Sequence, residues 1–309
     1  MAYQQGDTIT AADFNNFAAN VNTVIGTGSG DKGYGLSEVS TVAAGNTITA
    51  VQWNSLLSGL QKAANHQGTT LTNASNTVTT SGNVLPLSNL GADVTLIDTN
   101  RGTAAGANLS TGVAGTTSTR STSWSGTITH TFTVNFGSSN AARHFFNSGG
   151  KIHLVFAQAN GAATAQNTAW SDLCSGLGTV TLDATDTTKT GGTYGTNTAI
   201  GYRDLTGTNQ TIMSAPIGSG DYTANDILIQ AKTDGSGLLT FQADLNDDHA
   251  AETGTYTGGG LGTAPNEGNA WTGTDAVDGD ISSTITFDKA DNASYVQVAS
   301  PSFSNIANL

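Results

Sequence analysis

Hydrophobic residues follow two different periods along this chain, and the change of period divides the sequence. In the first 68 residues they recur every three to four positions, which is typical of amphipathic helices. After residue 124 they alternate with polar residues, which is typical of strands with one buried face. We predict a mainly β protein with a helical docking domain at 1–68, an extended Thr-, Ser- and Gly-rich linker at 69–123 and a β-rich body at 124–309.

The helical part contains an internal repeat. GDTITAADFN occupies residues 6–15 and GNTITAVQWN occupies residues 45–54, with the glycine, the Thr-Ile-Thr-Ala run, the aromatic residue and the asparagine all in register. The apolar spacing that follows predicts helices over 11–25 and 50–65. The alternative explanation is coincidence in a chain rich in threonine and alanine.

Both predicted helices begin with residues suited to a helix N-terminus. Thr10 is a good N-cap, and Asp13 places a negative charge in the first turn, where it is favoured. Thr49 and Gln52 fit the capping-box pattern. Short amphipathic helices are marginal alone, so we expect them to pack on each other or on a partner as a duplicated docking unit. The predicted docking residues are those of the two apolar faces: Phe14, Phe17, Val21, Trp53, Leu56, Leu57 and Leu60.

The alternating part predicts several antiparallel strands joined by glycine-rich loops. This arrangement indicates an antiparallel β-sandwich or a jelly-roll-like body. A turn at 234–237 joins two alternating runs and predicts a hairpin. The predicted strand-like segments lie within 127–136, 151–157, 226–245, 281–290 and 295–303.

Composition and charge narrow the function classes. Only 11% of the residues are charged, and 39 are glycine, which favours strands and turns over long helices. The net charge of −13 and the scattering of ten basic residues argue against nucleic-acid binding. No apolar run is long enough for membrane insertion, and residues 1–10 lack the features of a secretory signal peptide. Within the linker, a denser island at 84–101 fits either a helix or a strand.

No catalytic, cofactor-binding or metal-binding residues emerge from the sequence, and we expect a protein that is not an enzyme. Cys174 is a single cysteine without a nucleophile signature, and we expect it to be small and partly buried. We expect His130 and His153 to be packed or cross-strand residues of strands. The stretch 28–33 matches the dinucleotide-binding glycine pattern, but it follows a helix instead of a strand, which argues against nucleotide binding.

One acidic stretch, 244–252, resembles the start of a calcium loop. Asp244, Asn246 and Asp248 stand at alternate positions, as the first ligands of such a loop do. The loop also requires glycine at its sixth position and glutamate at its twelfth, and this chain has His249 and Thr255 there. The preferred interpretation is a solvated loop after a strand.

Two stretches carry a resemblance to a known class. Residues 123–161 contain the run AARHFFNSGG, at 141–150, followed by an alternating strand. This stretch resembles a segment of virion structural proteins of tailed bacteriophages, and the N-terminal region with its second copy is similar to the start of such proteins. In this run we expect Phe145 and Phe146 to plug an edge of the core, Ser-Gly-Gly to turn the chain, and Arg143 to pair with an acidic neighbour.

The resemblance implies a virion protein made in the host cytoplasm, with the helical part docking on the neck, portal or tail and the body forming a fibre, collar or appendage. It also implies a homo-oligomer, and by family analogy a trimer. Two other functions stay open. One is a capsid-decorating protein, and the other is a module that binds a host receptor or glycan through loop aromatics, namely Tyr194, Tyr202, Tyr256 and Trp271.

Overall fold

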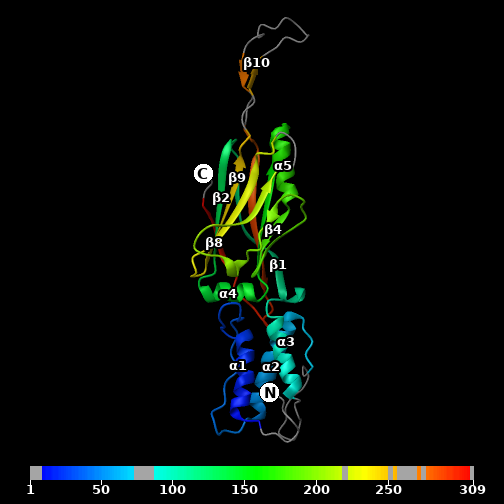
Figure 1. Ribbon diagram of the computed structural model, residues 1–309, viewed down its shortest axis with the longest axis vertical. Helices are drawn as coiled ribbons and strands as arrows, with labels where there is room; N and C mark the ends of the chain where they lie inside the picture. The colour runs from blue at the N-terminus through cyan, green and yellow to red at the C-terminus, as the bar shows by residue number, and fades with distance from the viewer. Residues whose placement is uncertain are drawn as a thin grey trace.

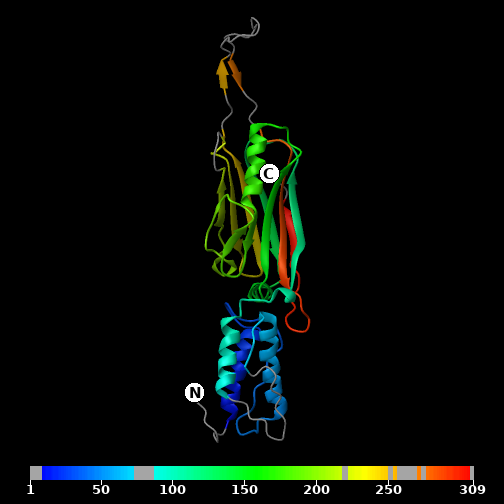
Figure 2. The same ribbon diagram turned by 90° about the vertical axis from the view of Figure 1, so that its right-hand side faces the viewer.

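The protein is an elongated molecule with helices at one end and two β-sheets in the middle, as a computed structural model shows (Figures 1 and 2). A two-stranded ladder of β10 (Thr253–Thr255) and β11 (Ala270–Thr272) lies beyond the far end of the sheets. The structure describes residues 9–72, 87–217, 222–249, 253–255, 270–272 and 276–306.

Three helices form a parallel bundle, and their C-terminal ends all face the sheets (Figure 1). They are α1 (Ala11–Ile25), α2 (Ala50–Gln67) and α3 (Leu87–Thr99). The parallel arrangement follows from the packing of Phe14 against Trp53, whose ring centroids are 5.1 Å apart and which stand at matching places near the helix starts. The predicted helix starts at residues 11 and 50 are confirmed, and α2 runs slightly past its predicted end.

Both of the first two helices begin with a complete capping box. The Thr10 hydroxyl accepts from the backbone N–H of Asp13, and the Asp13 carboxylate accepts from the backbone N–H of Thr10. Thr49 and Gln52 form the same pair of bonds at the start of α2. Each box therefore satisfies two backbone donors that a helix leaves without an intrahelical partner.

An extended segment after α1 lets the next helix point the same way. Side-chain amides of α1 hold this segment: Asn15 exchanges two hydrogen bonds with the backbone of Val42, and Asn22 does so with Val39, at 2.7–2.8 Å. Val39 and Val42 are buried against the bundle. The segment returns the chain to the free end of the bundle, where α2 begins (Figure 1).

The body consists of two antiparallel sheets. The five-stranded sheet has the order β1 (Leu109–Arg120), β12 (Asp280–Ala290), β3 (Lys151–Ala159), β4 (Thr179–Leu182), β5 (Thr187–Thr190). The six-stranded sheet has the order β13 (Ser302–Ile306), β2 (Gly126–Asn135), β9 (Leu238–Asp247), β8 (Asp226–Thr233), β7 (Gln210–Pro216), β6 (Thr196–Asn197). Helices α4 (Ser139–Asn147) and α5 (Ala165–Leu177) and the 3₁₀ turns Gly106–Asn108 and Tyr202–Asp204 complete the described elements.

The two sheets share a core. Alternate residues of β2, β9, β12 and β3 point into it, as the period-two pattern predicts. His130 of β2 is fully buried there, and its Nδ1 lies 2.6 Å from the Ser283 Oγ of β12, so the packed histidine of the sequence analysis is confirmed. At one side of the body, Asn305 of β13 donates to the Thr117 carbonyl of β1; at the other, Asn197 of β6 donates to the Thr187 carbonyl of β5.

Two expectations about chain segments are wrong. The segment 69–123 is not an extended linker where it is described, because it holds α3 and β1. Burial of Leu90, Val94 and Ile97 at helical spacing makes the denser island a helix. The remainder, 73–86, lies outside the described residues. The last strand is 302–306 instead of 295–303; Val296 and Val298 are buried, but they belong to a turn region.

Candidate functional site at the junction of helices and sheets

The helical bundle meets the body through a contact surface that we call the junction. It consists of the loop 26–36 after α1, the C-terminal ends of α2 and α3, helix α4 and the residues 148–151 that follow it. Figure 1 shows α4 lying across the end of the sheets, directly above the bundle. The AARHFFNSGG run therefore forms the body's side of the junction.

Backbone carbonyl groups of the loop are the acceptors for α4. Arg143 donates from Nη2 to the carbonyl oxygens of Thr27 and Gly28, at 2.9 and 3.1 Å, and His144 donates from Nε2 to Thr27 at 2.9 Å. The expected ion pair of Arg143 is therefore wrong, because its guanidinium meets main-chain oxygens and the Asn140 amide instead of a carboxylate. The glycine-rich stretch 28–33, which matches the dinucleotide-binding pattern, thus accepts a hydrogen bond from Arg143 at the carbonyl oxygen of Gly28.

A glycine permits a close approach between the loop and α4. Gly35 has φ +76°, and a Cβ at that position would lie 2.4 Å from Nδ1 of His144. A side chain would have to displace the imidazole and also adopt a strained backbone conformation. The loop and the α4 histidine can pack together only because residue 35 has no side chain.

The second helix contacts the body through a buried histidine. His66 is fully buried, and its Nε2–H donates to the carbonyl oxygen of Ser148 at 3.1 Å. Burial lowers the pKa of His66 to about 4, with a small opposing effect from the bond to Ser148. The backbone carbonyl of His66 accepts from Ala105 N–H and from the Asn108 side chain. The imidazole is therefore neutral at ordinary pH, and both the ring and the backbone of His66 are bonded to segments outside α2.

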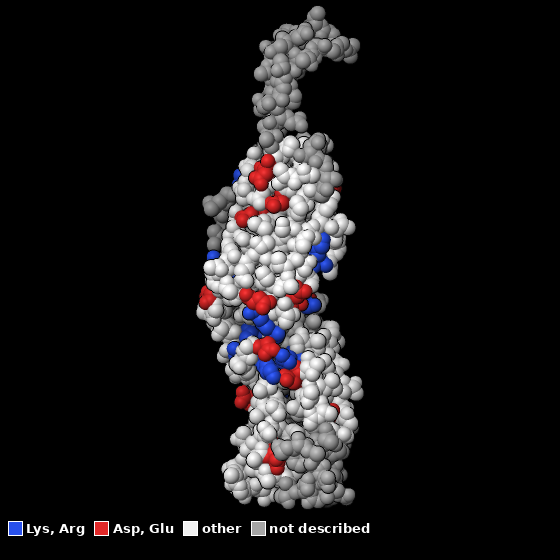
Figure 3. Space-filling model, viewed as in Figure 1, with Lys and Arg blue, Asp and Glu red and all other residues white. Residues whose placement is uncertain are grey.

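Charged side chains gather at the junction, although they are scattered along the sequence (Figure 3). Arg101 pairs with Asp31 and lies 3.6 Å from Asp98, which Lys32 also contacts at 3.0 Å. The hydrogen bond from Arg101 holds the pKa of the Asp31 carboxyl below its usual range. Half of the basic residues belong to the junction or line the adjoining cavity: Lys32, Arg101, Arg143, Lys151 and Arg203.

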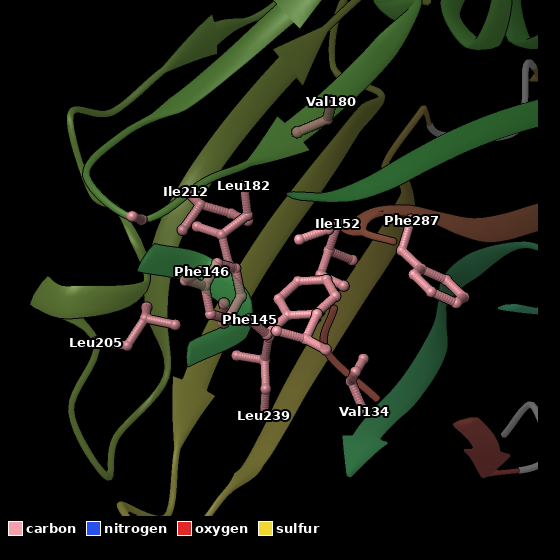
Figure 4. Close-up of a cluster of buried hydrophobic side chains, with 14 of the residues drawn as sticks. Val134, Phe145, Phe146, Ile152, Val180, Leu182, Leu205, Ile212, Leu239 and Phe287 are labelled. Atoms are coloured by element: carbon pink, nitrogen blue, oxygen red, sulfur yellow. The ribbon is translucent and has the colours of Figure 1, made fainter. Parts of the chain in front are cut away.

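Two aromatic residues fix α4 to the sheets. Phe145 and Phe146 are each 1% exposed and lie among side chains from both sheets (Figure 4). Phe146 stacks on Tyr202 with a centroid distance of 4.1 Å, and Phe145 lies 6.3 Å from Phe287. The prediction that this pair plugs an edge of the core is confirmed.

The predicted docking residues are mostly interior. Phe14, Val21, Trp53, Leu56 and Leu60 are buried between the helices, so they build the bundle and are unavailable to a partner. Phe17 and Leu57 are partly buried against the same core. The helical period identifies the face that is hidden, but it does not distinguish a partner from a neighbouring helix of the same chain. The exposed large apolar side chain of the first two helices is Val51, at 77%.

Two of the loop aromatics expected to contact a host receptor or glycan pack against other residues of the same molecule. Tyr202 stacks on Phe146, and Tyr194 packs over Gly176 and against the core. Tyr256 and the side chain of Trp271 lie outside the described residues. Neither Tyr194 nor Tyr202 is therefore free to act as a flat exposed platform.

One side-chain set has the connectivity of a hydrolytic triad. On the outer face of the five-stranded sheet, His153 contacts Thr181 Oγ1 through Nδ1 at 2.9 Å and Asp288 through Nε2 at 3.1 Å. The strands of all three residues have neighbours on both sides, so their backbone N–H groups are committed to the sheet and provide no oxyanion site. His153 is thus a cross-strand residue, as predicted.

The other candidates from the sequence are structural. Cys174 is 2% exposed in α5, and burial raises the pKa of its thiol to about 12. Asp244 and Asn246 stand on β9 instead of in a loop, and 250–252 lies outside the described residues, so the described part of the stretch is not a calcium loop. Among the residues with described positions, no group of three potential ligands clusters as a metal site, and none of the helices is long and apolar enough to cross a bilayer.

Comparisons with protein-family models, with curated proteins and with solved structures found no match to this chain. The candidate site rests on geometry alone. The AARHFFNSGG run is recognisable in the sequence, but its partner loop is not, since the glycines of 26–36 do not indicate what they approach. The pairing of a glycine-rich loop with a helix carrying Arg143 and His144 becomes apparent only in three dimensions.

Proposed function

We propose that this chain is a non-enzymatic structural component of a tailed-phage particle. The helical bundle attaches it to the neck, portal or tail, and the body, a β-sandwich of jelly-roll-like topology, forms a fibre, collar or appendage. The observation that carries the proposal is the linear order of bundle, junction, body and projecting ladder (Figure 2). The phage assignment itself rests on the resemblance of residues 123–161.

The junction supports an attachment role because it joins the two parts firmly. Hydrogen bonds cross it from α2 and from α4, at His66 and at Arg143 and His144. The Asn147 amide also donates to the Gly33 carbonyl, and Arg203 donates to Asn147. An appendage held at one end must transmit load from its body to its anchor, and a junction crossed by several hydrogen bonds, two of them buried, suits that task.

The repeat supports a bundle built by triplication of one helical unit. The letters Gly82-Asn83 precede α3 as Gly6-Asp7 precede α1 and Gly45-Asn46 precede α2. Equivalent buried positions then recur at the same spacing in each helix: Phe14 and Val21, Trp53 and Leu60, Leu90 and Ile97. We propose that the attachment surface is the outside of this bundle, where Val51 and the partly buried Phe17 and Leu57 lie.

The test is to locate the chain in intact particles, by antibody labelling together with quantitative mass spectrometry. A small, fixed copy number at the neck or tail is the expected result. Copies spread over the shell would favour capsid decoration, and absence from particles would reject the proposal.

A pair of matched variants tests the attachment surface. Val51→Asp places a charge on the bundle, and Val155→Asp places one on the exposed face of β3, where Val155 is 39% exposed. We expect Val51→Asp to lower incorporation into particles and Val155→Asp to leave it unchanged. Equal incorporation of both variants would exclude the bundle surface around Val51.

Binding of a host glycan or receptor is a second candidate, favoured by one observation. The β10–β11 ladder lies beyond the end of the body that is opposite the bundle, which is the end an attached appendage presents outward (Figure 1). Deletion of 253–275 from the purified chain should abolish adsorption to host cells if this candidate holds. The melting temperature of the body should be retained, because the deletion spares Val277 and Asp278, which pack on the body.

A further inference from the structure

A cavity of about 320 Å³ opens beside the junction. A purely structural role gives no reason for a cavity there. Its wall is built from separate chain segments: the residues after α3, the end of α4, the start of β3, the β4–β5 turn and the 3₁₀ turn at 202–204. Its volume lies within the range of small-molecule sites.

Two cations, Lys151 and Arg203, line the cavity. In the described part of the chain, Lys151 forms no ion pair and no side-chain hydrogen bond. Arg203 donates from Nη2 to the Asn147 amide oxygen at 2.7 Å and to the Asp31 carbonyl at 3.4 Å. Its guanidinium is also attracted to the carboxylates of Asp31, Asp183 and Asp204. An anionic group in the cavity would therefore find an ammonium group at Lys151 that the described residues do not use, and a second positive charge at Arg203.

One carboxylate stands in the same wall. Asp183 accepts at Oδ1 from the backbone N–H groups of Thr185 and Asp186, each at 2.8 Å. Those bonds fix the orientation of the carboxylate. Among the described contacts its second oxygen, Oδ2, accepts no hydrogen bond, so it can accept one from a hydroxyl group of a ligand. Its negative charge also disfavours a doubly charged ligand such as phosphate.

The rest of the wall combines apolar and hydroxyl groups. Phe146, Leu109 and Ala104 supply an apolar surface, and Thr103 and Thr185 supply hydroxyls. A ligand that fits the whole wall carries one carboxylate, several hydroxyl groups and a compact ring with an apolar face. That description is an acidic monosaccharide.

We propose that this cavity binds a hexuronate, with Lys151 and Arg203 at its carboxylate and Asp183 at a ring hydroxyl. The site joins residues from both sides of the junction, so the bound sugar would also strengthen the contact between bundle and body. The proposal is independent of where the chain stands in a particle.

Isothermal titration of the full chain with D-glucuronate tests the proposal, with D-glucose and inorganic phosphate as comparison ligands. We expect saturable binding of glucuronate, no measurable binding of glucose, and phosphate binding at least about tenfold weaker than glucuronate binding. Lys151→Gln should weaken glucuronate binding about tenfold or more, because a charge-assisted hydrogen bond is lost. Lys62→Gln, a matched change on the exposed side of α2, should leave binding unchanged.

A second measurement needs no variant. Acetylation of the lysines of the wild-type chain, quantified by mass spectrometry, should be slowed at Lys151 by glucuronate and unaffected at Lys62. Absence of saturable binding up to about 10 mM glucuronate would overturn the proposal. Equal affinity for phosphate would reduce the site to an anion pocket and overturn the sugar assignment. Equal losses in the Lys151 and Lys62 variants would place any binding elsewhere.

Discussion

His66 of α2 donates a hydrogen bond from its Nε2 to the carbonyl oxygen of Ser148, 3.1 Å away, and this bond ties the bundle to the residue that ends α4. The ring of Tyr34 stands edge-on to the same imidazole, with centroids 5.2 Å apart. His66 is fully buried, so protonation of the ring would place a charge out of contact with water.

The pH dependence of stability follows from this burial. The folded-state pKa of His66 is about 4, below its ordinary value of 6.5, so between these pH values the unfolded chain binds a proton that the folded chain does not. Stability is therefore complete above pH 6.5 and falls as the pH drops toward 4, by about 3 kcal/mol for this residue. Burial also lowers the pKa of His130 to about 4, so this residue changes the stability with pH in the same direction.

The measurement is the free energy of unfolding from denaturant titrations at several pH values between 4 and 7. His66→Gln keeps a donor for the Ser148 carbonyl but cannot be protonated, so its stability should fall less steeply toward pH 4 than that of the wild type. The carboxylates contribute equally to both proteins. Identical slopes for variant and wild type would contradict a neutral buried His66.

Gly35→Ala should destabilise the junction by more than about 2 kcal/mol. Alanine would have to adopt a left-handed backbone conformation, and its Cβ would clash with the His144 ring. Gly30→Ala is the matched control: Gly30 has φ +58° in the same loop, and a Cβ there meets nothing within 4 Å. The control should lose only about 1 kcal/mol, from the backbone conformation alone. Equal losses in chemical denaturation would show that loop and α4 can separate without cost.

Phe146→Ala should cost about 3–5 kcal/mol of the free energy of unfolding, because it removes a buried ring and its stacking on Tyr202. Val155→Ala, at a position that is 39% exposed, should change the stability by less than about 0.5 kcal/mol. Thermal and urea unfolding of both variants check this. A small loss for Phe146→Ala would mean that α4 is not anchored through its aromatic pair.

We expect the two capping boxes to make separate and similar contributions to the free energy of unfolding. Thr49→Ala should destabilise by about 1 kcal/mol, and Thr49→Ser should be close to the wild type because the hydroxyl is kept. Thr10→Ala should cost a similar amount at α1. Unfolding followed by far-ultraviolet circular dichroism provides the measurement, and an unchanged midpoint in both alanine variants would refute the role of the caps.

The sequence predicts the elements with a strong period and misses those without one. The starts of α1 and α2 and the strands around 126–135 and 226–247 follow from caps and alternation. Strand β1 has no alternation, because its residues are mostly half-exposed and polar, so its segment reads as a linker. Its place is fixed by pairing with β12, which is remote in sequence.

The candidate site was less predictable than the fold. Arg143 and His144 could be singled out from their run, but their partners are backbone carbonyl groups, which every residue carries and no residue type marks. The cavity combines Lys151, Asp183 and Arg203 from three segments, and such a grouping depends on tertiary packing. In the same way, residue types alone predicted a docking face, and the structure buries most of that face inside the bundle.

The common direction of the three helices has an electrostatic consequence. In an antiparallel bundle the macrodipoles of neighbouring helices largely cancel, but here they add, with about half a negative elementary charge at each C-terminus. The negative poles all lie at the junction, where Lys32, Arg101 and Arg143 lie, so the dipoles add to the attraction that Asp31 and Asp98 already provide for these cations. The positive poles all lie at the opposite end, where the Asp13 carboxylate in the first turn of α1 offsets part of their charge.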